Sequence, residues 1–443
     1  MSTTNLPKVS FLKVYRNAKR ILKNPLPFHR ENFEKLGDVF VVRLGLKSRA
    51  VFTRDPLHAK HVLQKHHKKY DKSALQTKDL GKYIGEGLLT ANGEKWLKQR
   101  RLIQPAFHKE KLEAIAATIR EVIKEELLQI KPDQEIDVHP IMGDLAFNVV
   151  GKSLFSYSDD GSTISRLKEI TETVQKSLIK EIRQPYKRWW FLFSGAIRNT
   201  FKQTDEARAI LNKIIEERRQ SEEKYDDLLD MLLEARYEDG GGMDNEQLID
   251  EILILFIAGH ETTSNALSFT LQLLAMHPEI QEKIYKNIQA IEIESLSFVE
   301  QSIKCRYVKQ CIEEAMRLYP PAYFADRVTV EEDVYNNLVF PKGSMLLISF
   351  YEIHRHKDFW KNPTQFDPDR FHPDRKKEYS NCYFPFGAGP RMCIGNNFAM
   401  YEMIFTISEL VKKYQITTNE KEVRINPLIT LKPKNATLAF KQR

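Results

Sequence analysis

The sequence predicts a mainly α-helical fold with a smaller β-rich part, and three observations support this fold class. From Pro56 to about residue 290, apolar residues recur almost throughout at the spacing of amphipathic helices. Alternating patterns, typical of strands, lie outside this region. The segment 244–276 is a long run of mostly apolar residues. A helix of that length and composition is normally buried on all sides, so the fold is expected to be organised around it.

The helical patterns follow one another along the chain with short breaks. Gly240-Gly241-Gly242 marks a flexible break before the long helix, and His277-Pro278 marks its end. The predicted helices occupy residues 94–107, 109–130, 141–155, 163–181, 203–220, 244–276, 278–290, 306–319 and 396–413.

Strands are predicted in three ranges. Residues 38–54 alternate around Gly45 and indicate a β-hairpin. Short strands cluster at 326–351, and residues 421–441 alternate again. We therefore expect one domain over residues 1–443, with a β-rich part assembled from these three ranges and no fused reductase.

The charge balance is mildly basic, with 68 Lys and Arg against 60 Asp and Glu and a net charge of +8. The basic residues do not gather into one block with interleaved aromatics, so no nucleic-acid partner is expected. A basic docking face for an acidic partner protein fits the same balance. The N-terminal residues lack the apolar core of a signal peptide, and Lys and Arg interrupt the nearby apolar stretches. We therefore expect no transmembrane anchor.

The chain has four cysteines, and no pair shows the short spacing of a zinc or iron–sulfur site. So few cysteines in so long a chain do not indicate a disulfide framework, and a reduced, cytoplasmic setting is expected. The four are Cys305, Cys311, Cys382 and Cys393.

Cys393 lies in an unusual loop. Residues 384–395 read Phe-Pro-Phe-Gly-Ala-Gly-Pro-Arg-Met-Cys-Ile-Gly, and a predicted helix starts just after them. Three glycines and a proline specify a rigid, non-repetitive loop in which backbone N–H groups can point at a sulfur. The helix dipole and free amides also stabilise a thiolate at a helix N-terminus. A lone buried cysteine is usually only a small hydrophobe, but this setting suits a metal-bound thiolate.

Five residues of this loop carry a family resemblance. The order Phe386, Gly389, Arg391, Cys393, Gly395 matches the haem-binding loop FxxGxRxCxG at every position. The chain resembles the cytochromes P-450, in particular the soluble bacterial type related to the haem domains of fatty-acid hydroxylases. The resemblance implies the cytochrome P-450 fold, haem b (iron protoporphyrin IX) as cofactor, Cys393 as the iron ligand, and monooxygenase activity with O2. Phe386, Arg391 and Gly395 are then expected beside the cofactor.

The long helix contains Ala258-Gly259-His260-Glu261-Thr262. Small residues at 258 and 259 let a flat macrocycle and O2 approach the helix backbone. A mid-helix threonine can bond a backbone carbonyl and open a local groove. The resemblance implies that Glu261 and Thr262 form the acid–alcohol pair that delivers protons to dioxygen. A solvent-facing glutamate is the plain alternative, but an isolated Glu on an apolar helix is costly. His260 is not expected to bind metal.

Glu314 and Arg317 share one face of the predicted helix 306–319 because they are three residues apart. The plain reading is a solvated pair worth about 0.3 kcal/mol. The resemblance adds Arg370 and implies a buried Glu314–Arg317–Arg370 cluster that holds the loop of Cys393. The family usually has Glu where this chain has Asp369.

Trp96 and Arg100 lie four residues apart on one face of the predicted helix 94–107. The resemblance implies that they bind the haem propionates together with Arg391 and Arg327. Arginine suits this role because its planar fork pairs with carboxylates. Ordinary core packing is the alternative for Trp96.

The resemblance also suggests a substrate pocket that is mostly apolar with a few hydroxyls, which allows a fatty acid, a terpenoid, a steroid or an O-methylated sugar. Core packing is about as good an explanation for each aromatic residue. The residues expected to line the pocket are Tyr83, Leu88, Leu89, Leu255, Ala258, Thr262, Ala322, Tyr323, Phe324 and Ile429.

Two further segments offer substrate contacts. Lys47 or Arg49 on the first hairpin can meet a carboxylate, although exposed bases there are usually only solvated. Trp189 and Trp190, in the segment 183–190, are flanked by basic residues and can stack on a sugar or lie against a membrane surface. Oxidative O-demethylation is therefore an option beside hydroxylation.

With no reductase expected on the chain, electrons are expected from a ferredoxin with its reductase or from a flavodoxin-type donor. One alternative is a relative that uses or rearranges peroxides, but such proteins often lack the acid–alcohol pair that Glu261 and Thr262 form here. A haem sensor or carrier is the other alternative, and it does not need that pair.

Overall fold

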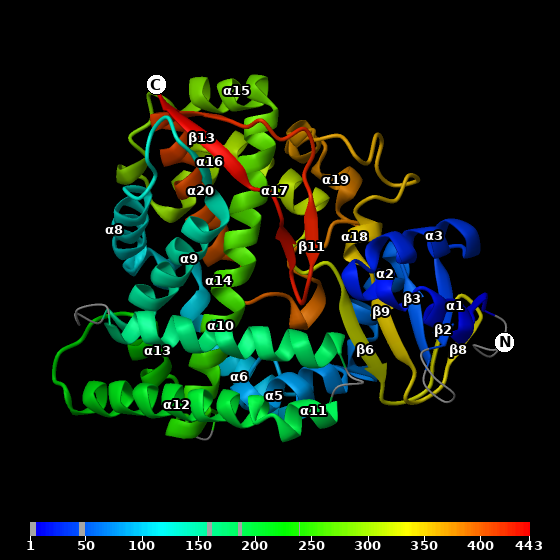
Figure 1. Ribbon diagram of the computed structural model, residues 1–443. Coiled ribbons are helices and arrows are strands. Elements are labelled where there is room, and N and C mark those ends of the chain that lie inside the picture. Colours follow the sequence, from blue (N-terminus) through cyan, green and yellow to red (C-terminus); the bar gives the residue numbers. More distant parts are fainter. Residues whose placement is uncertain (1–5, 44–48, 157–161, 185–187, 239) are drawn as a thin grey trace.

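The computed structural model describes residues 6–43, 49–156, 162–184, 188–238 and 240–443. A large helical body lies beside a smaller β-rich part (Figure 1). The fold class predicted from the sequence is therefore confirmed.

The helices lie close to the predicted ranges, with several short ones before the first of them. Within the described residues, no helix combines the length and apolar character needed to cross a membrane. The helices are α1 (Phe11–Arg16), α2 (Ala18–Lys23), α3 (Leu26–Leu36), α4 (Pro56–Lys60), α5 (Gly81–Ile84), α6 (Gly93–Ile103), α7 (Lys109–Ala114), α8 (Ala116–Leu127), α9 (Val138–Phe155), α10 (Ser162–Arg183), α11 (Arg188–Phe193), α12 (Ala196–Gln220), α13 (Leu228–Glu234), α14 (Asn245–Met276), α15 (Pro278–Ile288), α16 (Phe298–Lys304), α17 (Arg306–Leu318), α18 (Phe350–Ile353), α19 (Lys376–Tyr379) and α20 (Asn396–Lys413).

Short 3-10 and π-helical turns connect several of these helices. The predicted helix 94–107 ends at Ile103 and continues as a 3-10 turn, because Pro105 has no backbone N–H to extend the helix. The predicted helix 109–130 bends at Ile115, so that α7 and α8 both turn apolar residues into the core. The turns are η2 (His61–Lys65), η3 (His67–Lys69), η4 (Leu75–Leu80), η5 (Gln104–Phe107), η7 (Ile293–Ser295), η8 (Pro368–Phe371) and η9 (Gly389–Arg391).

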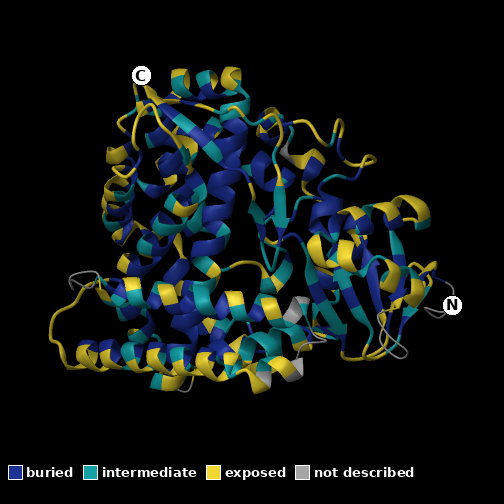
Figure 2. Ribbon diagram, viewed as in Figure 1, coloured by how far each residue is buried: buried dark blue, intermediate teal, exposed yellow. Residues whose placement is uncertain are grey.

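Helix α14 runs through the helical body and packs against α9, α17 and α20 (Figure 1). Its first turn is capped by Asp244, whose side chain accepts a hydrogen bond from the Gln247 N–H. Most of the helix is buried (Figure 2). Ala258, in its middle, is exposed, and Thr262 one turn later is half-buried. The helix therefore opens on one side at the segment expected to face the cofactor.

Six strands form the main sheet, in the order β1-β2-β3-β9-β6-β4. The predicted hairpin is present, with Val41 paired to Val51, and its turn lies outside the described residues. The strands are β1 (Lys8–Val9), β2 (Val39–Arg43), β3 (Arg49–Thr53), β4 (Tyr70–Asp71), β5 (Glu135–Asp137), β6 (Ala325–Thr329), β7 (Asp333–Tyr335), β8 (Leu338–Phe340), β9 (Met345–Ile348), β10 (Tyr414–Thr417), β11 (Ile425–Pro427), β12 (Leu431–Pro433) and β13 (Thr437–Gln442).

The C-terminal strands lie in two smaller sheets. Within the described residues they do not pair with the sheet formed by residues 38–54 and 326–351: β13 pairs with β10 and β5, and β11 pairs with β12. The alternation of β13 buries Leu438 and Phe440 in the core of the helical body, which explains why the strand lies there.

Candidate active site

The loop before α20 is shaped by its glycines. Gly387 and Gly389 have φ values of +72° and +71°, a region that side chains other than glycine rarely adopt. The Cys393 N–H donates to the Phe386 carbonyl at 2.9 Å, which closes the loop on itself. A Cβ at Gly389 would lie 1.9 Å from the Leu63 carbonyl oxygen of η2, so only glycine fits at this contact.

Cys393 is surrounded by protein but keeps an exposed surface. Burial raises the pKa of its thiol, while a hydrogen bond from the Gly395 N–H and the nearby Arg100 guanidinium lower that pKa. Arg100 also donates to the Met392 carbonyl at 2.9 Å and so holds α6 against the loop. Amide and guanidinium both favour a thiolate at this sulfur, as a metal ligand requires.

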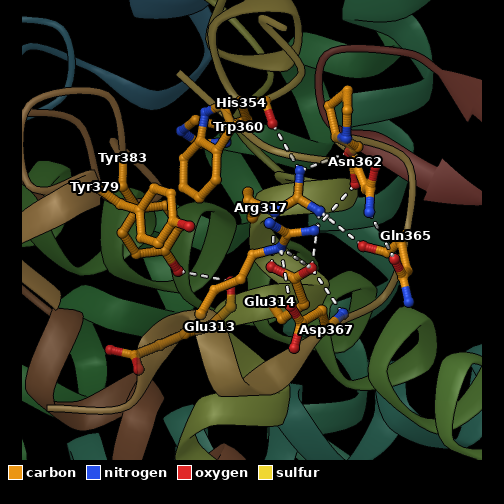
Figure 3. Close-up of polar contacts among 12 residues, drawn as sticks. Glu313, Glu314, Arg317, His354, Trp360, Asn362, Gln365, Asp367, Tyr379 and Tyr383 are labelled. Atoms are coloured by element: carbon orange, nitrogen blue, oxygen red, sulfur yellow. Dashed lines mark hydrogen bonds and ion pairs between the residues drawn. The ribbon is translucent and has the colours of Figure 1, made fainter. Parts of the chain in front are cut away.

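The three side chains of the predicted cluster are present and buried. Figure 3 shows Glu314 and Arg317 facing each other. Arg317 donates to both Glu314 carboxylate oxygens, at 2.6 and 2.8 Å, and the Nε of Arg370 donates to the same carboxylate at 3.2 Å. Burial raises the pKa of Glu314 above its usual range, although Arg317 and Arg370 oppose this shift. Asp369 lies outside the cluster, exposed, and pairs with Lys283 at 3.0 Å. The presence of Asp369 in place of the family's usual glutamate therefore leaves the cluster intact.

The cluster reaches the cysteine loop through His354. Arg317 donates to the His354 carbonyl at 2.8 Å (Figure 3). The His354 Nε2 accepts the Phe384 N–H at 2.8 Å. Burial, followed by the charge of Arg317, lowers the pKa of His354 well below its usual range. A neutral ring can accept this hydrogen bond, so the first residue of the loop is held by a buried, uncharged histidine. Sequence reasoning missed His354 because nothing nearby in sequence indicates its partner.

Three cationic side chains, Arg391, Arg327 and Lys72, lie near one another beside the loop. Arg391 donates to Asp71 at 3.0 Å, and its guanidinium lies 5.1 Å from the Trp96 ring centroid. Its Nη1 is buried and has no hydrogen-bond partner in the described residues. Burial and the charge of Arg391 lower the pKa of Arg327 to about 10. Lys72 was missed by sequence reasoning, since a lysine in a lysine-rich segment is usually solvated.

Lys72 is buried and donates to the Leu88 and Ala91 carbonyls at 2.7 and 2.8 Å. Burial, with the charges of Arg391 and Arg327, lowers its pKa to about 6. A site that crowds cations in this way favours an anionic ligand.

These residues fit haem b. The free Nη1 of Arg391 and the crowded Arg327 and Lys72 suit the two propionates of the macrocycle, and Trp96 supports Arg391 from the side. Cys393 offers a sulfur with an exposed surface for the iron. Arg100, by contrast, contacts the loop backbone at Met392, and its predicted role with the propionates stays a prediction.

The predicted acid–alcohol pair lies at the open side of α14. The Thr262 hydroxyl donates to the Ala258 carbonyl at 2.8 Å, the helix-widening contact expected there. The Glu261 carboxylate is nearly buried and pairs with Lys432 of β12 at 2.5 Å. Sequence reasoning missed Lys432, because a lysine in an alternating tail is normally solvated. The ring of His260, the residue between Gly259 and Glu261, makes a hydrogen bond with the Phe256 carbonyl at 2.6 Å.

The predicted pocket residues divide into two groups. Two of them are placed differently from the expectation. Tyr83 is buried, bonds Glu181 of α10, and lines a polar cavity of about 520 Å³ between α5, α12 and the start of α14. Tyr323 is buried in a core cluster, and its hydroxyl donates to the Leu428 carbonyl at 2.7 Å. The others keep exposed surface and can still line a pocket: Leu88, Leu89, Leu255, Ala258, Thr262, Ala322, Phe324 and Ile429.

The two minor substrate contacts are only partly described. Lys47 lies outside the described residues, and Arg49 is exposed on β3. Of the segment 183–190, residues 185–187 lie outside the described residues, as does the side chain of Trp189. Trp190 is 67% exposed on α11.

Comparisons with known proteins agree with this geometry. The family model described as "Cytochrome P450" matches residues 6–440. The chain is 32% identical to a cyclooctat-9-en-7-ol 5-monooxygenase of Streptomyces melanosporofaciens, over 86% of this chain and 83% of that protein. It is 31% identical to a cytokinin hydroxylase of Arabidopsis thaliana, over 94% and 82% respectively.

A solved structure shows the same fold. The crystal structure of the cytochrome P450DA heme domain superposes with a TM-score of 0.83 at 21% identity, covering 94% of this chain and 93% of that one. The fold, the family model and the loop around Cys393 all support the same conclusion. The chain belongs to the cytochrome P450 family and is a haem-thiolate monooxygenase whose cofactor is haem b.

Proposed function

We propose that this monooxygenase hydroxylates an apolar, terpenoid-like substrate, with Glu261 and Thr262 delivering protons and a separate protein supplying electrons. The observation that carries the proposal is the contact of Thr262 with the Ala258 carbonyl on the open side of α14, next to the buried Glu261. A peroxide-using or peroxide-rearranging enzyme, or a haem carrier, does not need this pair.

The haem bound at Cys393 supplies the activation of O2. The protein's own residues hold and move the protons. Thr262 is fixed by the Ala258 carbonyl, so its oxygen faces the open side of the helix. Glu261, one residue away, is held by Lys432, whose side chain is 23% exposed. A proton entering from solvent at Lys432 can therefore reach Glu261 and pass through water to Thr262.

The substrate class rests on the lining and on the names of relatives. The pocket residues that keep exposed surface are mostly apolar, which favours a hydrocarbon skeleton over a sugar. Similar proteins include the cyclooctat-9-en-7-ol 5-monooxygenase, an 11-oxo-beta-amyrin 30-oxidase of Medicago truncatula and a pentalenene oxygenase of Streptomyces avermitilis. All three names denote oxidation of cyclic terpenoids, one of the classes expected from the sequence.

The electron donor is proposed to be an acidic ferredoxin or flavodoxin. Helix α6 is joined to the cysteine loop by Arg100, and its outer face carries the exposed Lys98 and Arg101. Met392, next to the iron ligand, is 37% exposed, and its carbonyl accepts the hydrogen bond from Arg100. Basic side chains on the helix that is joined to the cysteine loop suit an acidic donor.

A spin-state titration tests the substrate class. Cyclic terpenoids should shift the haem from low to high spin and yield a hydroxylated product with a surrogate ferredoxin and reductase. Fatty acids, steroids and O-methylated sugars serve as the comparison panel. The terpenoid proposal would be contradicted if a compound of the comparison panel gave the spin-state shift and a product while the cyclic terpenoids gave neither.

Two variants test the chemistry. Cys393→Ser should remove the long-wavelength Soret band that marks thiolate ligation in the reduced carbon monoxide complex. Thr262→Ala should leave that band in place and divert electrons to hydrogen peroxide. Unchanged coupling of electron use to product in Thr262→Ala would remove Thr262 from the mechanism.

A further inference from the structure

We propose that His61, His66 and Asp333 form a binding site for a divalent transition metal, with zinc as the fitting ion, separate from the haem site. The three residues come from η2, the segment after it, and β7. One nitrogen from each histidine and one Asp333 oxygen lie within 4.8 Å of one another. Of the His, Cys, Asp and Glu side chains in the described residues, these three lie close enough together to hold one ion.

The distances suit a small change on binding. His61 Nε2 lies 2.7 Å from one Asp333 oxygen, and His66 Nδ1 lies 4.0 Å from the other. Zinc bonds of about 2.0–2.1 Å in a tetrahedral site place ligand atoms about 3.3 Å apart. The His66 side chain is 41% exposed and can rotate to close the remaining gap.

Asp333 is prepared for such a role by its surroundings. Its side chain is only 2% exposed, and the Tyr70 hydroxyl donates to it at 2.5 Å. A hydrogen bond that orients a ligating carboxylate is a regular part of metal sites, because it fixes the oxygen that faces the ion. Two imidazoles and one carboxylate are also ligands that zinc accepts, and water can take the fourth position.

Lys69 competes for the same carboxylate. Its ammonium lies 3.4 Å from Asp333 and also 3.4 Å from Glu331, which is 60% exposed. A dication at Asp333 would repel this ammonium toward Glu331. The site therefore has a built-in competitor whose removal should strengthen metal binding. If these residues only formed ion pairs with one another and bound no metal, removal of Lys69 would produce no gain in zinc affinity.

The position of the site gives metal binding a structural consequence. The ion would join η2 to the β7–β8 hairpin. The same η2 supplies the Leu63 carbonyl against which Gly389 of the cysteine loop packs. Zinc should therefore stabilise the support beneath that loop without touching the haem.

The test uses the chelator-treated holoprotein, titrated with zinc chloride and followed by calorimetry and by the thermal midpoint. Zinc bound per chain is measured separately from haem iron by elemental analysis. The wild type should bind one zinc and rise in thermal midpoint with zinc. His66→Ala should lower the affinity at least about tenfold, since loss of even an outer-shell partner costs 10–100-fold. Because the His66 side chain is 41% exposed, this variant should fold normally.

Two further variants complete the design. Lys69→Met should raise the zinc affinity, because it removes the competing ammonium. His67→Ala, at the neighbouring histidine, is the matched control and should bind zinc as the wild type does. Absence of zinc binding by the wild type, equal binding by His66→Ala, or equal loss in His67→Ala would each overturn the proposal.

Discussion

Glu251 is a buried carboxyl on the first half of α14. Its oxygens accept the Leu88 N–H at 2.9 Å and the Gln247 amide at 3.0 Å. Burial, with a contribution from the charge of Asp250, raises its pKa from 4.5 to about 7. The folded chain therefore holds a proton that the unfolded chain has lost between these values. Stability falls as the pH rises through this window and remains lower above it.

Glu251→Gln should remove that pH dependence. At about 1.4 kcal/mol for each pH unit, the window from 4.5 to about 7 corresponds to ~3 kcal/mol. Between pH 5 and pH 8 the thermal midpoint of the wild type should fall more than that of the variant, and the variant should be the more stable at pH 8. Glu246→Gln, at an exposed position of the same helix, is the control. Parallel pH profiles for wild type and Glu251→Gln would contradict the assignment.

Lys432 and Glu261 form a pair that decides how a buried carboxylate is held beside Thr262. Lys432→Met should cost about 1–3 kcal/mol, because it leaves that carboxylate without its partner. It should also increase the hydrogen peroxide formed per electron pair consumed. Glu261→Gln in the same background should cancel most of the stability loss in a double-mutant cycle. Lys434→Met, at an exposed lysine two residues further along the tail, should change neither quantity. An equal effect there would argue against the pair.

At the scale of elements, the cysteine loop is positioned by what it packs against. Its own sequence specifies glycines, but their separate roles depend on η2. Gly387 and Gly389 have nearly the same φ, yet a Cβ at Gly387 would meet nothing within 4 Å. The one at Gly389 would meet the Leu63 carbonyl. Sequence reasoning identified the loop and could not distinguish these two glycines.

The two glycines provide a matched pair of variants. Gly387→Ala should cost only the backbone strain of a left-handed residue, about 1–2 kcal/mol, and keep the haem. Gly389→Ala adds the collision with Leu63, so the loop must move and the haem content of the purified protein should drop. Haem per chain, measured by absorbance, and the thermal midpoint check this difference. Equal haem loss in both variants would show that strain alone decides the outcome.

At the scale of the whole molecule, the Glu314 cluster joins parts that are far apart in sequence. The carboxylate on α17 neutralises Arg317 and Arg370, and it also accepts the Asp367 N–H at 2.9 Å. Arg317 in turn donates to backbone carbonyls at three places, including that of His354. The helical body and the cysteine loop are thereby tied together around one buried carboxylate.

Glu314→Gln should therefore be far more damaging than a surface change. It leaves two buried guanidinium groups without a counter-charge, a loss of about 3–5 kcal/mol. We expect a lower thermal midpoint and haem loss on purification. Glu313→Gln, the adjacent position, keeps the backbone carbonyl that Tyr383 bonds and should be mild. Near-wild-type stability of Glu314→Gln would contradict the role of the cluster.

Local pattern by itself determined much of this protein. The apolar length of α14, the hairpin at 38–54 and the loop around Cys393 were all predictable, because each depends on spacing along the chain. The same holds for the Glu314–Arg317 pair, which one helical turn brings together.

Only the tertiary structure decided which distant residues meet. Strand β13 pairs with β10 and β5 outside the main sheet, because its Leu438 and Phe440 find their apolar partners in the helical body. Lys72 and Lys432 look like solvated lysines in the sequence, yet one lies among the cations near Cys393 and the other holds Glu261. Burial and long-range charge set these roles, and neither can be read from neighbours along the chain.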